Sequence, residues 1–337
     1  MPAQHPLDMA LLNTWQRGFP LCLRPFQALG AALALDEDEV LRRYARLHQA
    51  GAFSRIGAVF APGAGGASTL AAMAVPPERL QQVADLVSAH AGVNHNYARE
   101  HQVNLWFVAT GRDAAQVEAL LQAIEQDAAL RVLRLPMLRP YRIDTAFDLG
   151  HGPQQARPTR SAAAALGPAD WPLAALAEQG LPLNERPYGD WAARLGLDTA
   201  AVLETLGRWS AQGTLARFGV VVRHHELGYG ANAMTVFDVP DAQADALGRA
   251  LAHQDGVTLA YRRARAPGWP FSLYCMVHGR DRGSVLARVH QARRAAGLDG
   301  FAHAVLFSTQ RFKQTGARRF AQHAPAAAED RHALTFQ

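Results

Sequence analysis

A chain of 337 residues exceeds one ordinary domain of about 150 residues, so at least two domains are expected. Hydrophobic residues make up 49% and charged residues 19%, a balance that excludes a disordered, collagen-like or coiled-coil chain. The net charge is +5, and of 34 lysines and arginines only Lys313 is a lysine. Because arginine binds carboxylates and phosphates bidentately, an anionic partner is expected, either a nucleic acid or a polycarboxylate.

The cysteine content and the hydropathy of the sequence indicate the cellular compartment of the protein. Cys22 and Cys275 are the two cysteines, and no Cys/His cluster has the spacing of a zinc site, which favours a reducing environment. No run of about 18 apolar residues occurs, and the first eight residues lack the charged and apolar regions of a leader. The sequence predicts a cytoplasmic protein without a membrane span.

An internal duplication is the strongest feature of the sequence. Residues 18–60 match residues 180–222 without a gap, which places Gly18 on Gly180. Residues 148–172, rich in Pro, Gly, Ala and Gln without an apolar period, are predicted to be a linker between the halves. Further matches follow in the same order: Val75-Pro76 on Val239-Pro240, Tyr97 on Tyr261, Arg99 on Arg263, and Gly111-Arg112-Asp113 on Gly279-Arg280-Asp281.

Each half is predicted to begin with a winged helix-turn-helix, over residues 11–60 and 173–222. A short helix and a turn precede a second helix, which starts after a capping aspartate, Asp36 or Asp198, and Gly51 ends that helix in the first half. The β-like strings 55–60 and 217–222 come next and are expected to form a wing or the first strand of the following sheet.

A β-α-β-β-α-β order is predicted for the rest of each half, over residues 61–147 and 223–320, with residues 321–337 as a tail. This order is typical of a ferredoxin-like antiparallel sheet with helices on one face. The sequence thus predicts an α+β protein made by tandem duplication. The expected elements are 68–75, 76–92, 93–100, 104–110, 112–126 and 130–140, then 231–239, 241–254, 257–263, 271–279, 284–295 and 303–308.

This layout resembles the leucine-responsive Lrp/AsnC regulators, which makes DNA binding the first hypothesis. The expected recognition helix of the first half carries Arg42, Arg43 and Arg46, which suit phosphates or guanines. The second half has Arg208 and the acidic Glu204 there. Because a symmetric regulator presents two equivalent helices to its half-sites, this divergence disfavours DNA binding. A DNA-binding regulator, with or without heme sensing, stays as the alternative.

Unusual motifs concentrate in the ferredoxin-like parts of both halves. They are Gly66-Ala67-Ser68-Thr69-Leu70, His95-Asn96-Tyr97-Ala98-Arg99, Asn104-Leu105-Trp106-Phe107, residues 224–234, residues 269–279, and Arg311-Phe312-Lys313-Gln314. Together they resemble the siroheme decarboxylases of heme d1 and alternative heme biosynthesis, and the likeness covers residues 15–319. Because that family usually occurs as two related subunits, the two halves resemble those subunits fused in one chain.

The resemblance implies a carboxy-lyase that removes CO2 from the C12 and C18 acetates of siroheme and gives 12,18-didecarboxysiroheme. No cofactor is expected beyond this iron-containing tetrapyrrole, and neither nucleic acid nor membrane is expected as a partner. Pairing of two chains through the winged helices, which otherwise serve as scaffold, and transfer of the product to other enzymes of heme d1 biosynthesis are the further expectations.

The reaction needs a proton donor and groups that hold carboxylates. His95 suits the donor role because imidazole titrates near neutral pH, and it is expected beside Tyr97 and Arg99 at a strand end. Axial ligation of the substrate iron by His95 is an equally physical alternative. Arg99, Arg263 and Arg265 suit the acetate or propionate groups.

Asn104 is a further expected substrate contact, and Trp106, Trp269 and Tyr274 are candidates for stacking on the macrocycle. Each assignment has a structural alternative, in which the tryptophans are core residues, the arginines pair with local carboxylates such as Glu100, and the histidine is a satisfied core group. A siroheme carrier without catalysis is the third function left open.

The two halves differ at the histidine. Leu259 and Ala260 stand where the first half has His95 and Asn96, so one competent pocket is expected rather than two. His224 and His225, absent from the first half, are expected to supply one wall of it.

Overall fold

The computed structural model describes residues 5–143, 163–223, 230–317 and 319–325. The chain forms two compact units, and each combines segments of both halves. The winged-helix unit contains the described parts of residues 3–65, 162–221 and 318–337, and the sheet unit contains those of 66–161 and 222–317. The duplication predicted from the sequence is therefore expressed within each unit.

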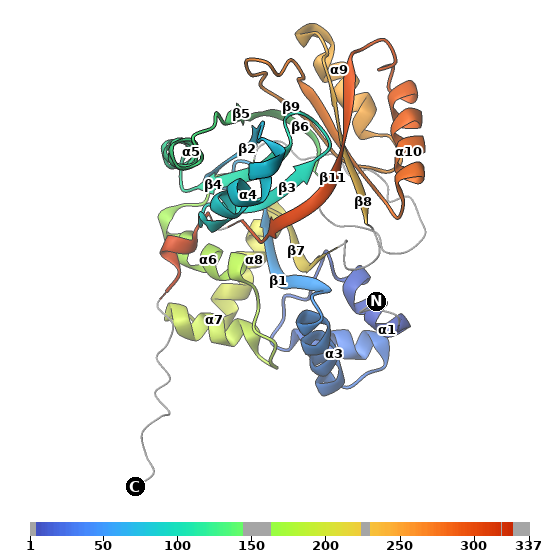
Figure 1. Cartoon of the computed structure of the whole chain (residues 1–337). Coiled ribbons are helices and arrows are strands. Elements are labelled where there is room, and N and C mark those ends of the chain that lie inside the picture. The colour runs from blue at the N-terminus through green and yellow to red at the C-terminus, as the bar shows by residue number, and fades with distance from the viewer. Residues whose placement is uncertain (1–4, 144–162, 224–229, 318, 326–337) are drawn as a thin grey trace. The chain divides into compact units, whose positions relative to one another are not determined.

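The winged-helix unit contains two corresponding sets of helices, one from each half of the chain (Figure 1). Asp36 and Asp198 cap the third helix of each set by accepting from the amides of Glu39 and Ala201, both at 2.6 Å, as predicted. Its elements are α1 (Pro6–Thr14), α2 (Pro25–Leu33), α3 (Glu37–Gln49) and β1 (Phe53–Phe60), then η2 (Pro168–Asp170), α6 (Trp171–Gln179), α7 (Pro187–Leu195), α8 (Thr199–Gln212), β7 (Leu215–Val222) and η4 (Ala321–His323).

The β-like segments that follow the third helix of each half neither form separate wings nor join the next sheet. β1 and β7 pair with each other in a two-stranded sheet, so each half completes the other. Gly57 and Gly219 occupy equivalent places in these strands, and a Cβ on Gly219 would lie 2.2 Å from the carbonyl oxygen of Trp15. This close approach of backbones requires glycine.

The sheet unit has the predicted β-α-β-β-α-β order in both halves, which confirms the α+β tandem duplication. The first half supplies β2 (Ala67–Met73), η1 (Pro77–Arg79), α4 (Leu80–Ala89), β3 (Val93–Arg99), β4 (Leu105–Gly111), α5 (Ala114–Ala128), β5 (Leu133–Leu135) and β6 (Met137–Ile143). The second supplies β8 (Ala231–Phe237), α9 (Asp241–Ala252), β9 (Val257–Arg263), β10 (Leu273–Gly279), α10 (Arg282–Ala295) and β11 (His303–Gln314).

The last strand of each half crosses into the other half. The nine-stranded sheet has the order β5-β2-β4-β3-β11-β8-β10-β9-β6. β11, the long red strand of Figure 1, pairs with β8 over its first residues and with β3 from Ser308 onward. β5 pairs with β2, and after Pro136 the chain continues as β6, which pairs with β9.

This exchange explains two differences from the predicted strands. The segment expected as one strand over 130–140 divides at Pro136, which has no amide to donate to a ladder. The strand expected over 303–308 extends to Gln314, because β3 of the other half offers it a second pairing edge. Neither partner is local in sequence.

Among the described residues of the sheet unit, the buried hydrophobic side chains form three clusters. One lies between the first-half strands and α4 and α5, and a second lies between the second-half strands and α9 and α10. The third mixes residues of both halves on the face away from the helices, and we call this face the inner face. Its buried members are Leu70, Ala72, Trp106, Leu135, Met234, Val236, Tyr261, Trp269, Tyr274, Met276 and Leu306.

Candidate active site

Strand β3 sorts its side chains between two environments. Asn96 faces α4, where its amide donates to the carbonyl of Ala84 at 2.9 Å and to Ser88 Oγ at 3.0 Å. Because successive side chains of a strand point to opposite faces, His95, Tyr97 and Arg99 share the inner face. The three residues predicted to carry the chemistry therefore lie together.

His95 and Tyr97 are near neighbours on this face. Their rings are nearly parallel, 16° apart in plane, with centroids separated by 6.3 Å. Burial raises the pKa of the Tyr97 phenol, and the cations of Arg311 and Arg99 counteract this only in part. Tyr97 is therefore a neutral hydroxyl donor at physiological pH.

Arg99 is buried, with 9% of its surface exposed, and has no carboxylate partner among the described residues. Its Nη1 donates to the carbonyl of Leu306 at 3.1 Å and to Asn232 Oδ1 at 3.4 Å. Burial lowers its pKa to about 10, so the side chain stays cationic at neutral pH. Its guanidinium also lies 5.8 Å from the Tyr97 ring centroid, and its Nε has no hydrogen-bond partner.

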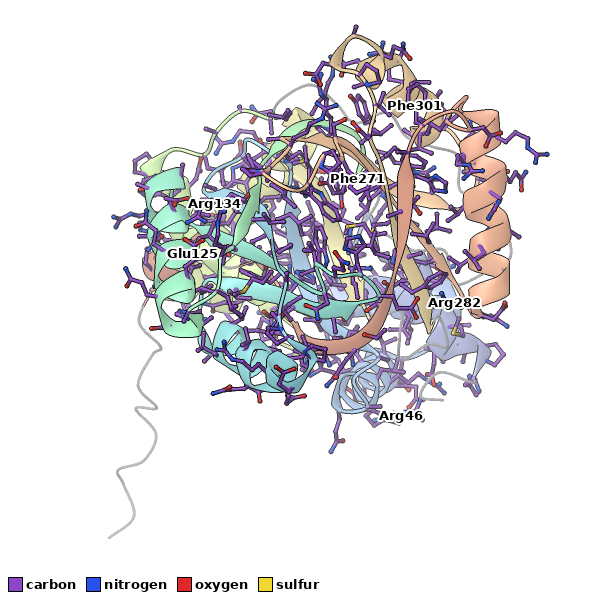
Figure 2. The ribbon with its side chains drawn as sticks, turned by 45° about the horizontal axis from the view of Figure 1, so that its top comes forward. Arg46, Glu125, Arg134, Phe271, Arg282 and Phe301 are labelled. Atoms are coloured by element: carbon purple, nitrogen blue, oxygen red, sulfur yellow. The ribbon has the colours of Figure 1, made fainter. Side chains whose placement is uncertain are left out.

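The alternative in which Arg99 pairs with Glu100 is wrong. Glu100 forms an ion pair at 2.7 Å with Arg282, which is labelled in Figure 2. The Arg282 guanidinium also lies over the Phe307 ring, 4.0 Å from its centroid. Glu100 thus ties the end of β3 to α10.

Strand β11 adds two polar residues to the inner face beside β3. Arg311 lies opposite Tyr97 and Gln314 lies opposite His95 in the antiparallel register, and Arg311 Nη1 donates to Gln314 Oε1 at 3.2 Å. Both residues belong to a motif on which the family resemblance rests, but no role was predicted for them, and the strand was expected to end at 308. The signal was the continued absence of a turn residue before Thr315.

The part of the inner face formed by β9 and β6 is equivalent to that formed by β3 and β11, but it has different side chains. Tyr261 and Arg263 are retained, and Arg263 Nη1 donates to the carbonyl of Leu135 at 2.7 Å. Leu259, Pro140 and Ile143 stand where the first place has His95, Arg311 and Gln314. We call the place on β3 and β11 the polar site and the place on β9 and β6 the apolar site.

Comparisons with known proteins agree with this arrangement. A model described as an AsnC-like ligand binding domain matches residues 64–142 and 226–313. A second model, the siroheme decarboxylase NirDL-like HTH domain, matches residues 8–53 and 173–215. The siroheme decarboxylase NirDL subunit of Paracoccus pantotrophus is 44% identical over 317 residues, which cover 92% of this chain and 96% of that protein.

The chain belongs to the siroheme decarboxylase family. The siroheme decarboxylase NirD subunit of Stutzerimonas stutzeri is 50% identical over 144 residues, 43% of this chain and 95% of that subunit, which confirms that two subunits are fused here. The crystal structure of the siroheme decarboxylase NirDL in co-complex with an iron-uroporphyrin III analogue has a TM-score of 0.66 and 25% identity, and covers 94% of both chains. The chain is accordingly a carboxy-lyase.

Several residues expected to contact the substrate of this siroheme decarboxylase pack against other parts of the protein. Trp106 and Trp269 are 2% and 1% exposed and pack edge to face at 5.1 Å. Tyr274 is fully buried and accepts from Trp269 Nε1 at 2.7 Å. The three rings lie within the inner core, as in the structural alternative, and their stacking on a macrocycle stays a prediction.

Two polar residues predicted to contact the substrate also have partners within the protein. The amide of Asn104 is engaged at both ends with the backbone of Val75, at 2.9 Å and 2.8 Å. Arg265 pairs with Asp241 at 2.6 Å, beside the start of α9. Both side chains hold loops in place, and neither joins the polar site.

His224 and His225, predicted as one wall of the pocket, lie outside the described residues. One histidine that the sequence did not single out is His278. It lies on β10 opposite Asn232, whose side chain accepts from Arg99, and its Nδ1 is 3.0 Å from Thr258 Oγ1. The link between His278 and the polar site depends on the register of β10 on β8, which could not be predicted from the sequence.

The arginines expected to read DNA are occupied within the winged-helix unit. Arg43 and Arg46 pair with the buried Asp8 at 2.8 Å and 2.6 Å, and Arg42 pairs with Glu39 at 3.1 Å. Across the described residues there is no group of three His, Cys, Asp or Glu side chains that could hold a metal ion. In the same part of the chain, no helix is long and apolar enough to cross a membrane.

Proposed function

We propose that this chain removes CO2 from the C12 and C18 acetates of siroheme at the polar site, giving 12,18-didecarboxysiroheme in heme d1 biosynthesis. The observation that carries the proposal is that His95, Tyr97 and Arg99 share one face with Arg311 and Gln314. A relative bound to an iron-uroporphyrin III analogue supports an iron tetrapyrrole as the ligand.

The reaction requires proton transfer but no net oxidation. Each acetate loses CO2, and the electrons left on the methylene carbon are taken up by one proton, which leaves a methyl group. No redox cofactor is therefore needed beyond the tetrapyrrole itself. Protonation of the adjacent ring carbon lets the macrocycle accept these electrons while the C–C bond breaks.

His95 is the proton donor in this proposal, because imidazole exchanges protons near neutral pH. Tyr97, whose raised pKa keeps the phenol neutral, supplies a hydroxyl donor for the substrate beside His95. Arg99 uses Nη1 for the carbonyl of Leu306, and in this proposal its cationic guanidinium also holds a substrate carboxylate. Ligation of the substrate iron by His95 is the competing role.

A single site has a kinetic consequence. The two acetates belong to different pyrrole rings, so the macrocycle must be reoriented after the first CO2 is lost. We expect a time course to show a species that has lost one CO2, rising and then falling before the final product. Direct conversion to the doubly decarboxylated product, with no such species at any time, would contradict reorientation at one site.

The winged-helix unit serves as scaffold in this proposal. Internal ion pairs neutralise the arginines of α3, and Arg208 of α8 pairs with Asp170 at 3.4 Å. A helix whose cations are already paired has little left to offer to DNA phosphates. Binding of a duplex with a salt-dependent affinity and a sequence preference would contradict this role.

The direct test is anaerobic incubation of the purified chain with siroheme, followed by mass spectrometry of the extracted tetrapyrrole. Loss of two CO2 units per siroheme is expected. An unchanged mass together with an altered absorption spectrum would indicate a carrier, and would overturn the proposed catalysis.

A further inference from the structure

The two crossing strands, β6 and β11, have the same backbone irregularities. The register of β11 on β3 shifts after Ser308 and again after Arg311. The register of β6 on β9 shifts at the equivalent points, after Met137 and after Pro140. The strands can therefore be compared residue by residue, and Arg311 corresponds to Pro140.

The positions that face the helices keep their function in both strands. Lys313 Nζ donates to the carbonyl of Ser88 at 2.7 Å, and its counterpart Arg142 donates through Nη1 to the carbonyl of Ala252 at 3.3 Å. Each cation thus binds the C-terminal end of a helix, where carbonyls lack partners. These positions maintain the fold and say nothing about a ligand.

The arginines on the inner face of β3 and β9 also act alike. Arg99 donates to the carbonyl of Leu306 and Arg263 donates to that of Leu135, and these two carbonyls are equivalent in the two ladders. Both arginines hold a last strand at the point where it crosses between the halves. Since the apolar site keeps this contact, part of the duty of Arg99 is structural.

Arg311 is different, because the apolar site has Pro140 in its place. At the apolar site, the last strand crosses between the halves with a proline at this position. The crossing of the strand therefore does not require a guanidinium there. Its head points to the same face as Tyr97 and its Nη1 is oriented by Gln314, a residue replaced by Ile143 at the apolar site. The pair Arg311–Gln314 accompanies the histidine and is lost with it.

We propose that Arg311, oriented by Gln314, anchors a carboxylate of the tetrapyrrole that the reaction leaves in place. This inference rests on the proposed function and adds a substrate-binding residue contributed by the second half. A guanidinium binds a carboxylate bidentately through two parallel N–H groups, which gives both affinity and orientation.

The anchored carboxylate cannot be the one that leaves. Decarboxylation moves negative charge from the carboxylate to the methylene carbon, so a cation on the carboxylate would stabilise the ground state more than the transition state and slow the reaction. A propionate, present in both substrate and product, is a consistent partner. Arg311 therefore contributes equally to substrate and product binding and affects KM more than kcat.

The test is anaerobic titration of siroheme and of didecarboxysiroheme into wild type, Arg311→Gln and Arg311→Lys, followed by absorption. Arg311→Gln should weaken both ligands by about 10- to 100-fold, as expected for a lost charge-assisted pair. Arg311→Lys should recover part of this affinity, because it keeps the charge without the fork. Arg139→Gln is the matched control, since Arg139 lies on the equivalent strand and pairs with Asp245.

Normal affinity of Arg311→Gln for both ligands would overturn the inference. So would weakening of siroheme alone, which would assign the side chain to a departing acetate. Because product binding is measured without turnover, these outcomes are independent of whether wild type decarboxylates siroheme. Comparison of thermal unfolding among the variants identifies a loss of affinity that comes from misfolding, and Arg311→Lys then carries the test.

Discussion

The polar and apolar sites share one backbone and differ in their side chains. The crossing strands, the bulges and the arginine contacts to Leu306 and Leu135 are present in both. On the inner face, by contrast, histidine, arginine and glutamine in one site are matched by leucine, proline and isoleucine in the other. Contacts to the helices and at the crossing are therefore sufficient for the fold, and the side chains of the inner face can differ between the two sites.

The winged-helix unit shows a smaller difference of the same kind. Glu178 near the end of α6 corresponds to Gln16 after α1, and both are buried. The Glu178 carboxylate accepts from the amide of Phe320 at 3.0 Å, and burial raises its pKa to about 7. The second half therefore carries a titratable group where the first half has a neutral one.

Replacement of the histidine should have the largest effect. His95→Leu copies the apolar site, and we expect turnover to fall by at least about a hundredfold because the general acid is lost. Leu259→Ala, at the equivalent position, is the control and should leave turnover per folded molecule unchanged. Anaerobic siroheme turnover measures both.

The same variant separates the two roles of His95. If His95 donates the proton, siroheme bound to His95→Leu keeps the absorption spectrum of the wild-type complex while turnover is lost. A changed spectrum with weaker binding would indicate ligation of the iron instead. Undiminished turnover would remove His95 from the mechanism.

The two crossing arginines allow a matched pair of variants with an intermediate effect. Arg99→Met and Arg263→Met should each lower the free energy of unfolding by about 1–3 kcal/mol, because each loses hydrogen bonds to buried acceptors. Arg99→Met should in addition weaken siroheme binding, whereas Arg263→Met should leave it unchanged. Chemical denaturation and siroheme titration measure the two effects, and equal loss of binding in both variants would contradict the division into polar and apolar sites.

Glu178→Gln should have the smallest effect, and only on stability. Because the folded pKa is raised above the ordinary value of 4.5, the carboxyl is protonated in both states at low pH, and its contribution to stability is lost as the pH rises through about 7. Glu178→Gln should therefore increase the free energy of unfolding at pH 8 by about 1–3 kcal/mol and change little at pH 4. An identical pH dependence of unfolding in variant and wild type would show that Glu178 does not titrate in this range.

The sequence was sufficient for the fold of each half and for the residues of β3. The duplication, the strand order and the caps at Asp36 and Asp198 all follow from local patterns and internal matches. The spacing of His95, Tyr97 and Arg99 along one short strand likewise predicts that they lie beside one another.

Pairing between the halves could not be predicted in this way. The position of Arg311 in the polar site depends on β11 pairing with β3 from Ser308 onward, and that register is set by a strand more than 200 residues earlier in the chain. The burial of Trp106 and Trp269 likewise depends on a core shared by both halves. Aromatic residues in apolar strands give no sign of whether a ligand or another strand covers them.

The number of siroheme molecules bound per chain distinguishes one competent site from two. Anaerobic titration of the chain with siroheme, followed by absorption at known protein concentration, should saturate at one siroheme per chain, with the affinity weakened in Arg311→Gln and unchanged in Arg263→Met. Saturation at two siroheme molecules per chain would show that the apolar site is also competent, and would contradict the account.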